Sequence, residues 1–372
     1  MGKTRFCVFC GKHPQAKNRE HVLPQWLLAL TGDPSRVVSL GVNYKTGEKI
    51  SFAWQALVVP ACVSCNSKFS ILEGRVRPII DGLLSRQSML ANDYDTLLDW
   101  LDKVRVGLWL NYHLIQENPT GLNPSFHIEN RVRTKDRLVA VYPLEGSAIG
   151  LNALGVETLA FHRAPSTFGL RINDILLINC SSDYIFSGRC GFPYPKKMQL
   201  FLDGKNQGMM YLSEFRITRK RKSPLFRFKL YKPSIYLLQP IMQKGVAPTV
   251  DFPSGFLGDY SSFDSFLAEN TLGTYLSGVG KLYRQHEGSV SRIDDMDDPV
   301  PFDSITGPES KRLGYLISQI YELQLYLQSL YTPVAENRDE LLRWNELQKM
   351  LRNFNRAYTR EYRKISNISH RD

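Results

Sequence analysis

The chain has 372 residues and a formal net charge of +11, from 47 lysines and arginines against 36 aspartates and glutamates. A chain of this length is too long to fold around one small hydrophobic core, so two or three domains are expected. No apolar run approaches the roughly 18 residues that span a bilayer, and the start, MGKTRFCVFC, lacks the apolar stretch of a signal peptide. We therefore expect a soluble, cytoplasmic protein with no membrane partner. The charge suits a polyanion such as nucleic acid; the alternative is a protein that is merely basic.

Two Cys-x-x-Cys pairs are the first specific pattern along the chain. Cys7 and Cys10 form one pair, and Cys62 and Cys65 form the other. In a reducing cytosol such pairs indicate metal binding, because two thiolates two residues apart can reach one ion and four complete a tetrahedral zinc site. The alternative is four buried or redox-active thiols. The pattern predicts a structural Zn²⁺ site that joins the two ends of a folded segment.

A Glu-His dipeptide lies in the segment between the cysteine pairs. Glu20 and His21 precede Pro24, which suits the first turn of a short helix with an apolar face. Residues 37–59 are expected to form two strands that are separated by a turn at 45–47. The second cysteine pair then opens a helix. An isolated Glu-His dipeptide is usually a solvated surface pair, so the interpretation depends on its surroundings.

The surroundings carry a resemblance to a known family. EHVLP between two Cys-x-x-Cys pairs, with the second pair running into Asn66 as CVSCN, resembles the zinc-stapled form of the HNH endonuclease family, which has the ββα-metal fold. The resemblance covers about residues 5–85. It implies that Glu20 and Asn66 hold a catalytic Mg²⁺ or Mn²⁺ ion and that His21 is the general base. It also implies a bacterial restriction or phage-defence nuclease.

The residue types suit phosphodiester hydrolysis. Mg²⁺ prefers oxygen ligands and keeps several waters, so one carboxylate and one amide oxygen are sufficient protein ligands. A neutral imidazole can accept the proton of the attacking water. Leu57 stands where the family usually has an Asn or His that braces the loop and orients the base, and Gln55 is the candidate replacement. The alternative function is a zinc-stabilised nucleic-acid-binding protein whose nuclease site has decayed.

Several basic residues are candidate contacts to the phosphates of the nucleic acid, which we expect to be DNA. Some lie near the Glu-His dipeptide and others form a run of four cations: Arg19, Lys68, Arg75, Arg219, Lys220, Arg221 and Lys222. For each cation taken singly, a solvated side chain is the alternative. Glu73 lies two helical turns after Asn66 and is a candidate support for Asn66 or for a basic side chain; the alternative is an exposed helix carboxylate.

The predicted fold class is α+β. Residues 1–90 are expected to form the zinc-stapled nuclease domain, and residues 91–286 a helix followed by a strand-rich antiparallel domain. Residues 287–308 are acidic and are predicted to be a linker. Residues 309–372 show two apolar stripes at helical spacing, which indicate a C-terminal helical hairpin. This hairpin packs either on the body or on another chain, as in a homo-oligomer or a complex with a partner protein.

Overall fold

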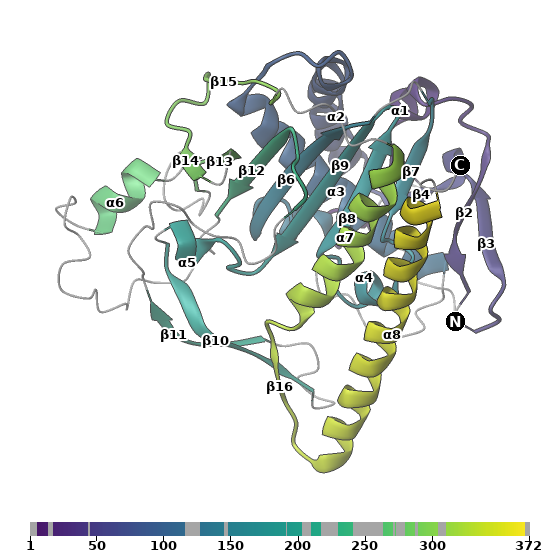
Figure 1. The fold of residues 1–372 in the computed structure, drawn as a ribbon, viewed down its shortest axis with the longest axis vertical. Helices are drawn as coiled ribbons and strands as arrows, with labels where there is room; N and C mark the ends of the chain where they lie inside the picture. The colour runs from purple at the N-terminus through teal and green to yellow at the C-terminus, as the bar shows by residue number, and fades with distance from the viewer. Residues whose placement is uncertain are drawn as a thin grey trace.

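The computed structural model describes most of the chain and has a mixed α and β architecture with several sheets (Figure 1). The described residues are 6–13, 18–43, 45–115, 127–144, 148–190, 192–202, 210–216, 230–240, 263–270, 272, 280–286, 289–303 and 310–368. Among them, no helix is both long enough and apolar enough to cross a bilayer.

An N-terminal unit contains the two cysteine pairs. Its elements are β1 (Asn18–His21), α1 (Gln25–Leu30), β2 (Val37–Val42), β3 (Lys49–Ala53), the 3₁₀ turn η1 (Trp54–Ala56), β4 (Val58–Ala61) and α2 (Val63–Leu84). Strands β1 and β4 pair in antiparallel fashion, and α2 follows β4 after a single residue. The unit therefore has a strand-strand-helix arrangement, with α1 and the β2–β3 hairpin inserted between its two strands.

Residues 49–59 do not form the single strand that their apolar run predicts. The turn η1 interrupts them because the N–H of Trp54 donates to the carbonyl of Arg36 (3.4 Å) and that of Gln55 to the carbonyl of Pro34 (3.1 Å). The buried Trp54 ring fixes the turn. As a result β3 pairs with β2, whereas β4 pairs with β1.

A seven-stranded antiparallel sheet forms the centre of the molecule, in the order β14-β13-β12-β6-β9-β8-β7. Its strands are β6 (Asp136–Pro143), β7 (Leu151–Leu154), β8 (Thr167–Ile172), β9 (Ile175–Ser182), β12 (Ile235–Gln239), β13 (Tyr283–His286) and β14 (Ser289–Arg292). Each pair of neighbouring strands in this sheet is antiparallel. Because both faces are covered, β6 and β9 are buried along almost their whole length.

Helices cover both faces of the sheet. Helix α3 (Ala91–Ile115) lies on one face, where its core includes Val139 and Val141 of β6. Helix α7 (Ser310–Gln328) lies on the other face, with Leu138 and Ala140 of the same strand. This division follows from the two-residue period of a strand. The cluster around α3 also contains Phe9, so the N-terminal unit and the sheet share one core.

The C-terminal hairpin packs on the body. It consists of α7, the short strand β16 (Thr332–Val334) and the long helix α8 (Arg338–Ile368), whose N-terminal end projects beyond the rest of the molecule in Figure 1. The Asn355 amide donates to the carbonyl of Tyr321 (3.0 Å) and to Gln324 Oε1 (2.8 Å). Apolar contacts join α7 to the sheet, and these polar contacts join α8 to α7.

The remaining elements lie around the sheet. They are β5 (Met89–Leu90), η2 (Ile128–Asn130), α4 (Leu159–Arg163), α5 (Ser187–Cys190), β10 (Tyr194–Phe201), β11 (Met210–Arg216), α6 (Phe263–Asn270) and β15 (Pro299–Val300). The acidic segment 287–308, predicted as a linker, is instead partly folded: it supplies β14 to the central sheet and β15 as the partner of β5. Ile293 and Val300 are buried, and this burial holds the segment against the body.

Candidate functional site

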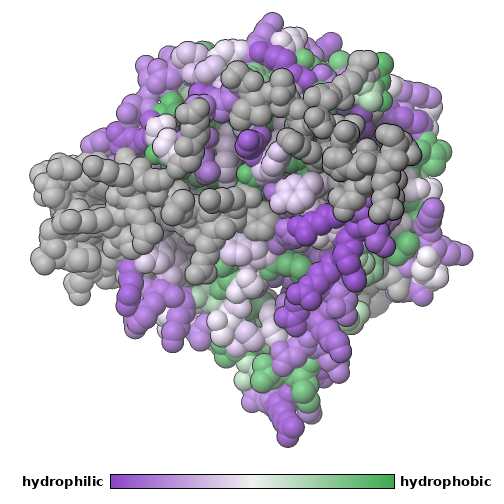
Figure 2. All heavy atoms as spheres, in the orientation of Figure 1, coloured by the Kyte–Doolittle hydropathy of each residue, from purple (hydrophilic) through white to green (hydrophobic). Residues whose placement is uncertain are grey.

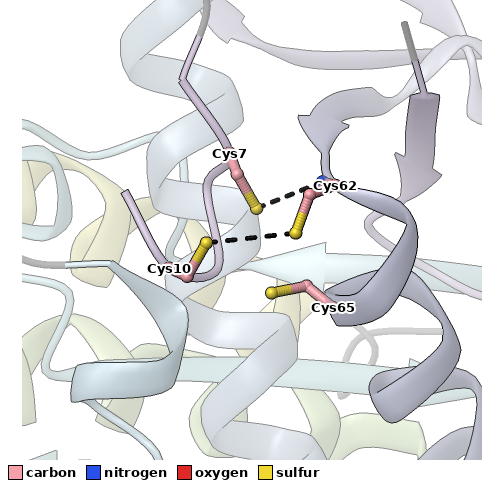
Figure 3. A group of neighbouring side chains, drawn as sticks. All are labelled: Cys7, Cys10, Cys62 and Cys65. Carbon is pink, nitrogen blue, oxygen red and sulfur yellow. Dashed lines mark hydrogen bonds between the residues drawn. The ribbon is translucent and has the colours of Figure 1, made fainter. Parts of the chain in front are cut away.

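The four cysteines of the two pairs converge at the start of α2 (Figure 3). Their sulfur atoms all lie within 4.8 Å of one another, and Cys10 Sγ is 4.0 Å from Cys62 Sγ. A tetrahedral zinc ion with bonds of about 2.3 Å requires sulfur separations of about 3.8 Å. All six cysteines belong to the described residues, and none forms a disulfide. The cluster can therefore hold a structural metal such as zinc, as the spacing predicts.

Backbone contacts bring the two cysteine pairs together. The N–H of Val8 donates to the carbonyl of Pro60 in β4 (2.9 Å), and the N–H of Cys62 donates to Cys7 Sγ (3.3 Å). Gly11 ends the first loop at φ +74°, where a Cβ atom would lie 2.2 Å from the ring of His127. Glycine is needed at this position for both its conformation and its size.

The thiols of the cluster lie in different environments. The hydroxyl of Ser64 lies 3.4 Å from Cys62 Sγ and is the largest contribution that lowers the pKa of that thiol to about 6. Burial raises the pKa of Cys7 and Cys65. A bound zinc ion deprotonates its thiol ligands, so it would replace these differences by a set of four thiolates.

Glu20 and His21 lie at the end of β1 and differ in exposure. Their cross-strand neighbours in β4 are Val59 and Val58, respectively. Because adjacent strand residues point to opposite faces, the Glu20 side chain enters the interior and is 7% exposed, whereas His21 is only half-buried. His21 Nε2 lies 2.6 Å from Nε2 of Gln25 in α1. The imidazole is thus held at the surface, beside an interior carboxylate.

A buried lysine of α3 connects Glu20 to Glu73. Lys103 is 1% exposed, and its Nζ donates to Glu20 Oε1 (3.1 Å), to Glu73 Oε1 and to the carbonyl of His21 (3.4 Å). Burial raises the pKa of Glu73 and outweighs the attraction of Lys103. Two carboxylates that share one ammonium leave a net negative charge in the interior when both are ionised. Glu73 therefore supports a basic side chain, which was one of its two expected roles.

Three residues of α3, spaced four apart, contact the strand pair that carries the Glu-His dipeptide. Lys103 binds Glu20, and the amide of Asn111 donates to the carbonyl of Val58 (3.1 Å), the neighbour of His21 across the ladder. Gly107 lies between them on α3. It approaches Val22 so closely that an added Cβ atom would be 3.1 Å from Val22 Cγ1. A spacing of four places residues on one face of a helix. This face braces β1 and β4 where the two strands meet α3.

Asn66, the other predicted metal ligand, and Leu57 lie on either side of β4 in the sequence. Asn66 occupies the first turn of α2, where its N–H donates to the carbonyl of Cys62 (3.0 Å), and its side chain is half-exposed. Leu57 is buried, and its carbonyl accepts the N–H of Val22 (3.1 Å), the residue after His21. The backbone at Leu57 thus braces the residue that follows the Glu-His dipeptide. Gln55 is exposed on η1.

The predicted phosphate contacts have varied environments. Arg19 is exposed on β1. Lys68 forms an exposed ion pair with Glu129 (2.5 Å), and Arg75 donates to Thr96 Oγ1 (2.9 Å). The run from Arg219 to Lys222 lies outside the described residues. Each of the three described cations therefore lies on or near the surface of the N-terminal unit.

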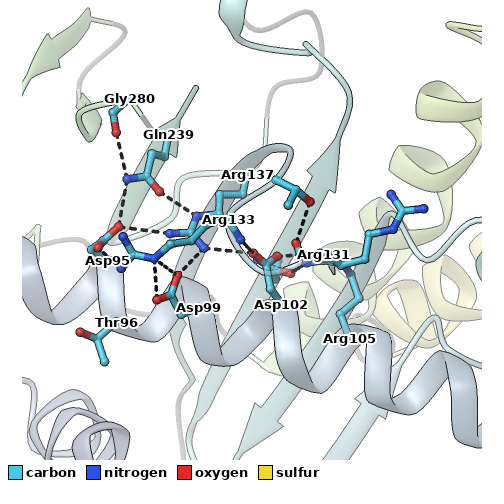
Figure 4. Close-up of polar contacts among 12 residues, drawn as sticks. Asp95, Thr96, Asp99, Asp102, Arg105, Arg131, Arg133, Arg137, Gln239 and Gly280 are labelled. Carbon is cyan, nitrogen blue, oxygen red and sulfur yellow. Dashed lines mark hydrogen bonds and ion pairs between the residues drawn. The ribbon is translucent and has the colours of Figure 1, made fainter. Parts of the chain in front are cut away.

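Prediction from sequence missed Lys103 and Asn111. The sequence of α3 nevertheless contains one sign that this helix has buried polar contacts. The helix is apolar overall but carries Asp95, Asp99 and Asp102, which lie on one face at intervals of four and three residues. Figure 4 shows these carboxylates facing Arg133 and Arg137. Charged residues within a predicted core helix require buried partners, so α3 could have been recognised as a helix with elements on more than one side.

The buried ion network of Figure 4 attaches α3 to the sheet. Arg137 of β6 is fully buried and donates to Asp99 (2.8 Å), Asp102 (3.0 Å) and Asp95 (3.1 Å). Burial opposes ionisation of Asp95, but the guanidinium groups of Arg137 and Arg133 lower its pKa. The network sets the position of α3 and, with it, the position of Lys103.

Comparison with known proteins identifies no relative: no family model, no curated sequence and no solved structure matches the chain.

Proposed function

We propose that the N-terminal unit is a metal-dependent HNH-type endonuclease site that hydrolyses phosphodiester bonds in DNA. One observation carries the proposal. The unit runs from β1 to β4 to α2, its ends meet at four cysteines that can hold zinc, and the Glu-His dipeptide lies at the end of β1. Asn66 follows the last cysteine directly. This order of elements matches the one that the sequence resemblance implies.

Glu20 and Asn66 supply a carboxylate and an amide oxygen, which are the ligand types that Mg²⁺ or Mn²⁺ accepts. When both carboxylates are ionised, Glu20, Lys103 and Glu73 carry a net negative charge, which suits a cation, and Lys103 donates to Oε1 of Glu20. A bound ion supplies Lewis-acid stabilisation of the phosphate. Glu20 and Asn66 are proposed to orient the scissile group, and Lys103 to fix the carboxylate of Glu20.

His21 is the proposed general base. Its half-buried ring is placed by Gln25 on one side, while its backbone carbonyl accepts a hydrogen bond from Lys103 (3.4 Å). In the neutral form, one ring nitrogen can take the proton of an attacking water. The proposed division of labour has an interior carboxylate that is held by α3 and a surface imidazole that reaches the solvent.

The second candidate function is a zinc-stabilised nucleic-acid-binding protein that does not cleave. Two observations favour it: Lys103 already pairs with Glu20, and Leu57 replaces a polar residue at the middle position. An ammonium beside Glu20 weakens the attraction of that carboxylate for a cation. The two candidates share the zinc site and differ only in whether Glu20 and His21 act in a reaction.

Cleavage assays separate the two candidates. The purified chain is incubated with supercoiled plasmid and with RNA, each with Mg²⁺, with Mn²⁺ and without added divalent ions. The endonuclease nicks the plasmid only with a divalent ion, and Glu20→Gln requires a higher ion concentration for the same rate. A parent protein that binds the plasmid but leaves it intact under all conditions would support the binding module instead.

A further inference from the structure

We propose that one face of α8 is a binding surface for the phosphate backbone of nucleic acid. Five exposed cations share this face and are here called the α8 stripe: Lys349, Arg352, Arg356, Arg360 and Lys364. Their spacings of three and four residues place them along one side of the helix. Figure 2 shows a hydrophilic band over α8 in the view of Figure 1.

The composition of the stripe differs from that of an ordinary solvated face. Arg352, Arg356 and Arg360 have no acidic residue three or four positions away, although Glu346 and Glu361 lie within that distance of the two terminal lysines. Like charges at a spacing of four repel each other and destabilise a helix. An exposed helix normally offsets its cations with acids at these spacings, so the three central arginines favour an external anion.

The helix dipole does not account for the stripe. Cations stabilise the C-terminal end of a helix, but this effect is confined to the last turn. Helix α8 ends at Ile368, whereas the stripe begins at Lys349. In the described part of the chain, none of its five members forms an ion pair, whereas nearby Arg363 pairs with Glu322 (2.5 Å). Most of the stripe is therefore unexplained by the stability of the helix itself.

The apolar face of α8 indicates which polyanion the stripe fits. Leu351 is buried, and Asn355 and Thr359 lie on the same inward side. A helix that binds a membrane places its apolar face in the lipid, but in α8 that face already packs on the body. The exposed part of the helix includes the stripe, a row of charges about 22 Å long, which corresponds to about six base pairs of duplex. This favours a stiff, linear polyanion over a lipid surface.

The inference deepens the proposed function, on which it rests for the choice of DNA as the polyanion. Its test measures binding and not cleavage. All variants carry His21→Ala, and no Mg²⁺ or Mn²⁺ is added. The stripe variant is Arg352→Gln, Arg356→Gln, Arg360→Gln and Lys364→Gln. The control variant removes the same charge from exposed lysines elsewhere in the chain: Lys45→Gln, Lys49→Gln, Lys197→Gln and Lys232→Gln.

Affinity for a mixed-sequence DNA duplex of about 25 base pairs is measured across a range of salt concentrations, together with thermal unfolding of each variant. The stripe variant is expected to flatten the slope of log affinity against log salt by up to about 0.9 for each lost contact. The control variant is expected to keep the parent slope. Equal flattening in both variants would overturn the inference, because net charge alone would then explain binding.

Two further outcomes also overturn the inference: a parent that does not bind the duplex, and a parent that binds phosphatidylserine vesicles through the stripe but not the duplex. If the proposed nuclease function is wrong and the stripe proposal is right, the plasmid stays uncut while duplex binding still depends on the stripe. Failure of the stripe alone would leave cleavage intact and the salt slope unchanged.

Discussion

At the scale of single residues, the two members of the Glu-His dipeptide belong to different environments. Glu20 lies among interior charges, where Lys103 and Glu73 fix its position, and His21 lies at the surface beside Gln25. Their opposite directions follow from the strand geometry of β1. The proposed site thus combines a rigid carboxylate with an imidazole that can reach a solvent-borne substrate.

Removal of Lys103 is expected to destabilise the protein strongly. Lys103→Met leaves two buried carboxylates without their shared cation, which typically costs about 3–5 kcal/mol. Lys68→Met is the matched control, because Lys68 also pairs with a glutamate but is 62% exposed, and exposed pairs contribute about 0–1 kcal/mol. Urea unfolding of both variants gives the comparison. Similar small losses in the two variants would show that the interior ion pair is not required.

The pH dependence of stability should report on Glu73. Burial raises its pKa above the usual value of 4.5, so between 4.5 and the raised value the folded state holds more protons than the unfolded state. Stability from this group is present below that window and is lost as pH rises through it. Unfolding free energies of the parent and Glu73→Gln, measured from pH 4 to 8, should therefore show the parent declining relative to the variant. A constant difference would contradict this assignment.

At the scale of elements, α3 has a double role. One face braces β1 and β4 through Lys103 and Asn111, and another face binds β6 through the ion network of Arg137. Cys62 caps helix α2, which carries Cys65 and Glu73, so the cysteine cluster and the interior charges are attached to one helix. A change in either helix would alter the position of the dipeptide.

The cysteine cluster is expected to stabilise the N-terminal unit. Parent protein freed of loosely bound ions should contain about one zinc per chain. Cys62→Ser should lose the metal together with the fold of β1, β4 and the start of α2, because zinc-binding energy is folding energy at such sites. Cys180→Ser, at a buried cysteine in β9, is the control that should retain zinc. Elemental analysis and hydrogen exchange test this. A well-folded parent that contains no zinc would contradict it.

At the scale of the whole molecule, local patterns predicted elements better than their partners. The cysteine spacing predicted the convergence of Cys7 and Cys62, and the apolar runs predicted β6 and β9. The contact between Lys103 and Glu20 joins positions 83 residues apart, and no local pattern indicates it. The acidic segment 287–308 was predicted to be a linker because of its charges. Its strand β14 forms a hairpin with the neighbouring β13, whereas its strand β15 pairs with β5, which lies far earlier in the chain.

The same limit applies to the candidate site. The sequence resemblance indicated Glu20, His21 and Asn66, but it gave no information on α3, which lies outside the resembling residues. Leu57 stands where the resemblance leads one to expect a polar residue, and in the structure its backbone carbonyl accepts the N–H of Val22 (3.1 Å). Backbone hydrogen bonds do not depend on side-chain identity, so this bracing could not be read from the residue type.

The central claim is that His21 acts as a general base in DNA cleavage, and the rate of plasmid nicking by His21→Ala tests it most directly. The control is His286→Ala, which removes an exposed histidine on β13. Loss of a general base lowers the rate of a reaction about 10² to 10⁴-fold. His21→Ala should therefore nick the plasmid more slowly by this factor, with unchanged zinc content, thermal unfolding and duplex binding. The control variant should cleave like the parent. If His21→Ala nicks the plasmid at the rate of the parent, the account is contradicted.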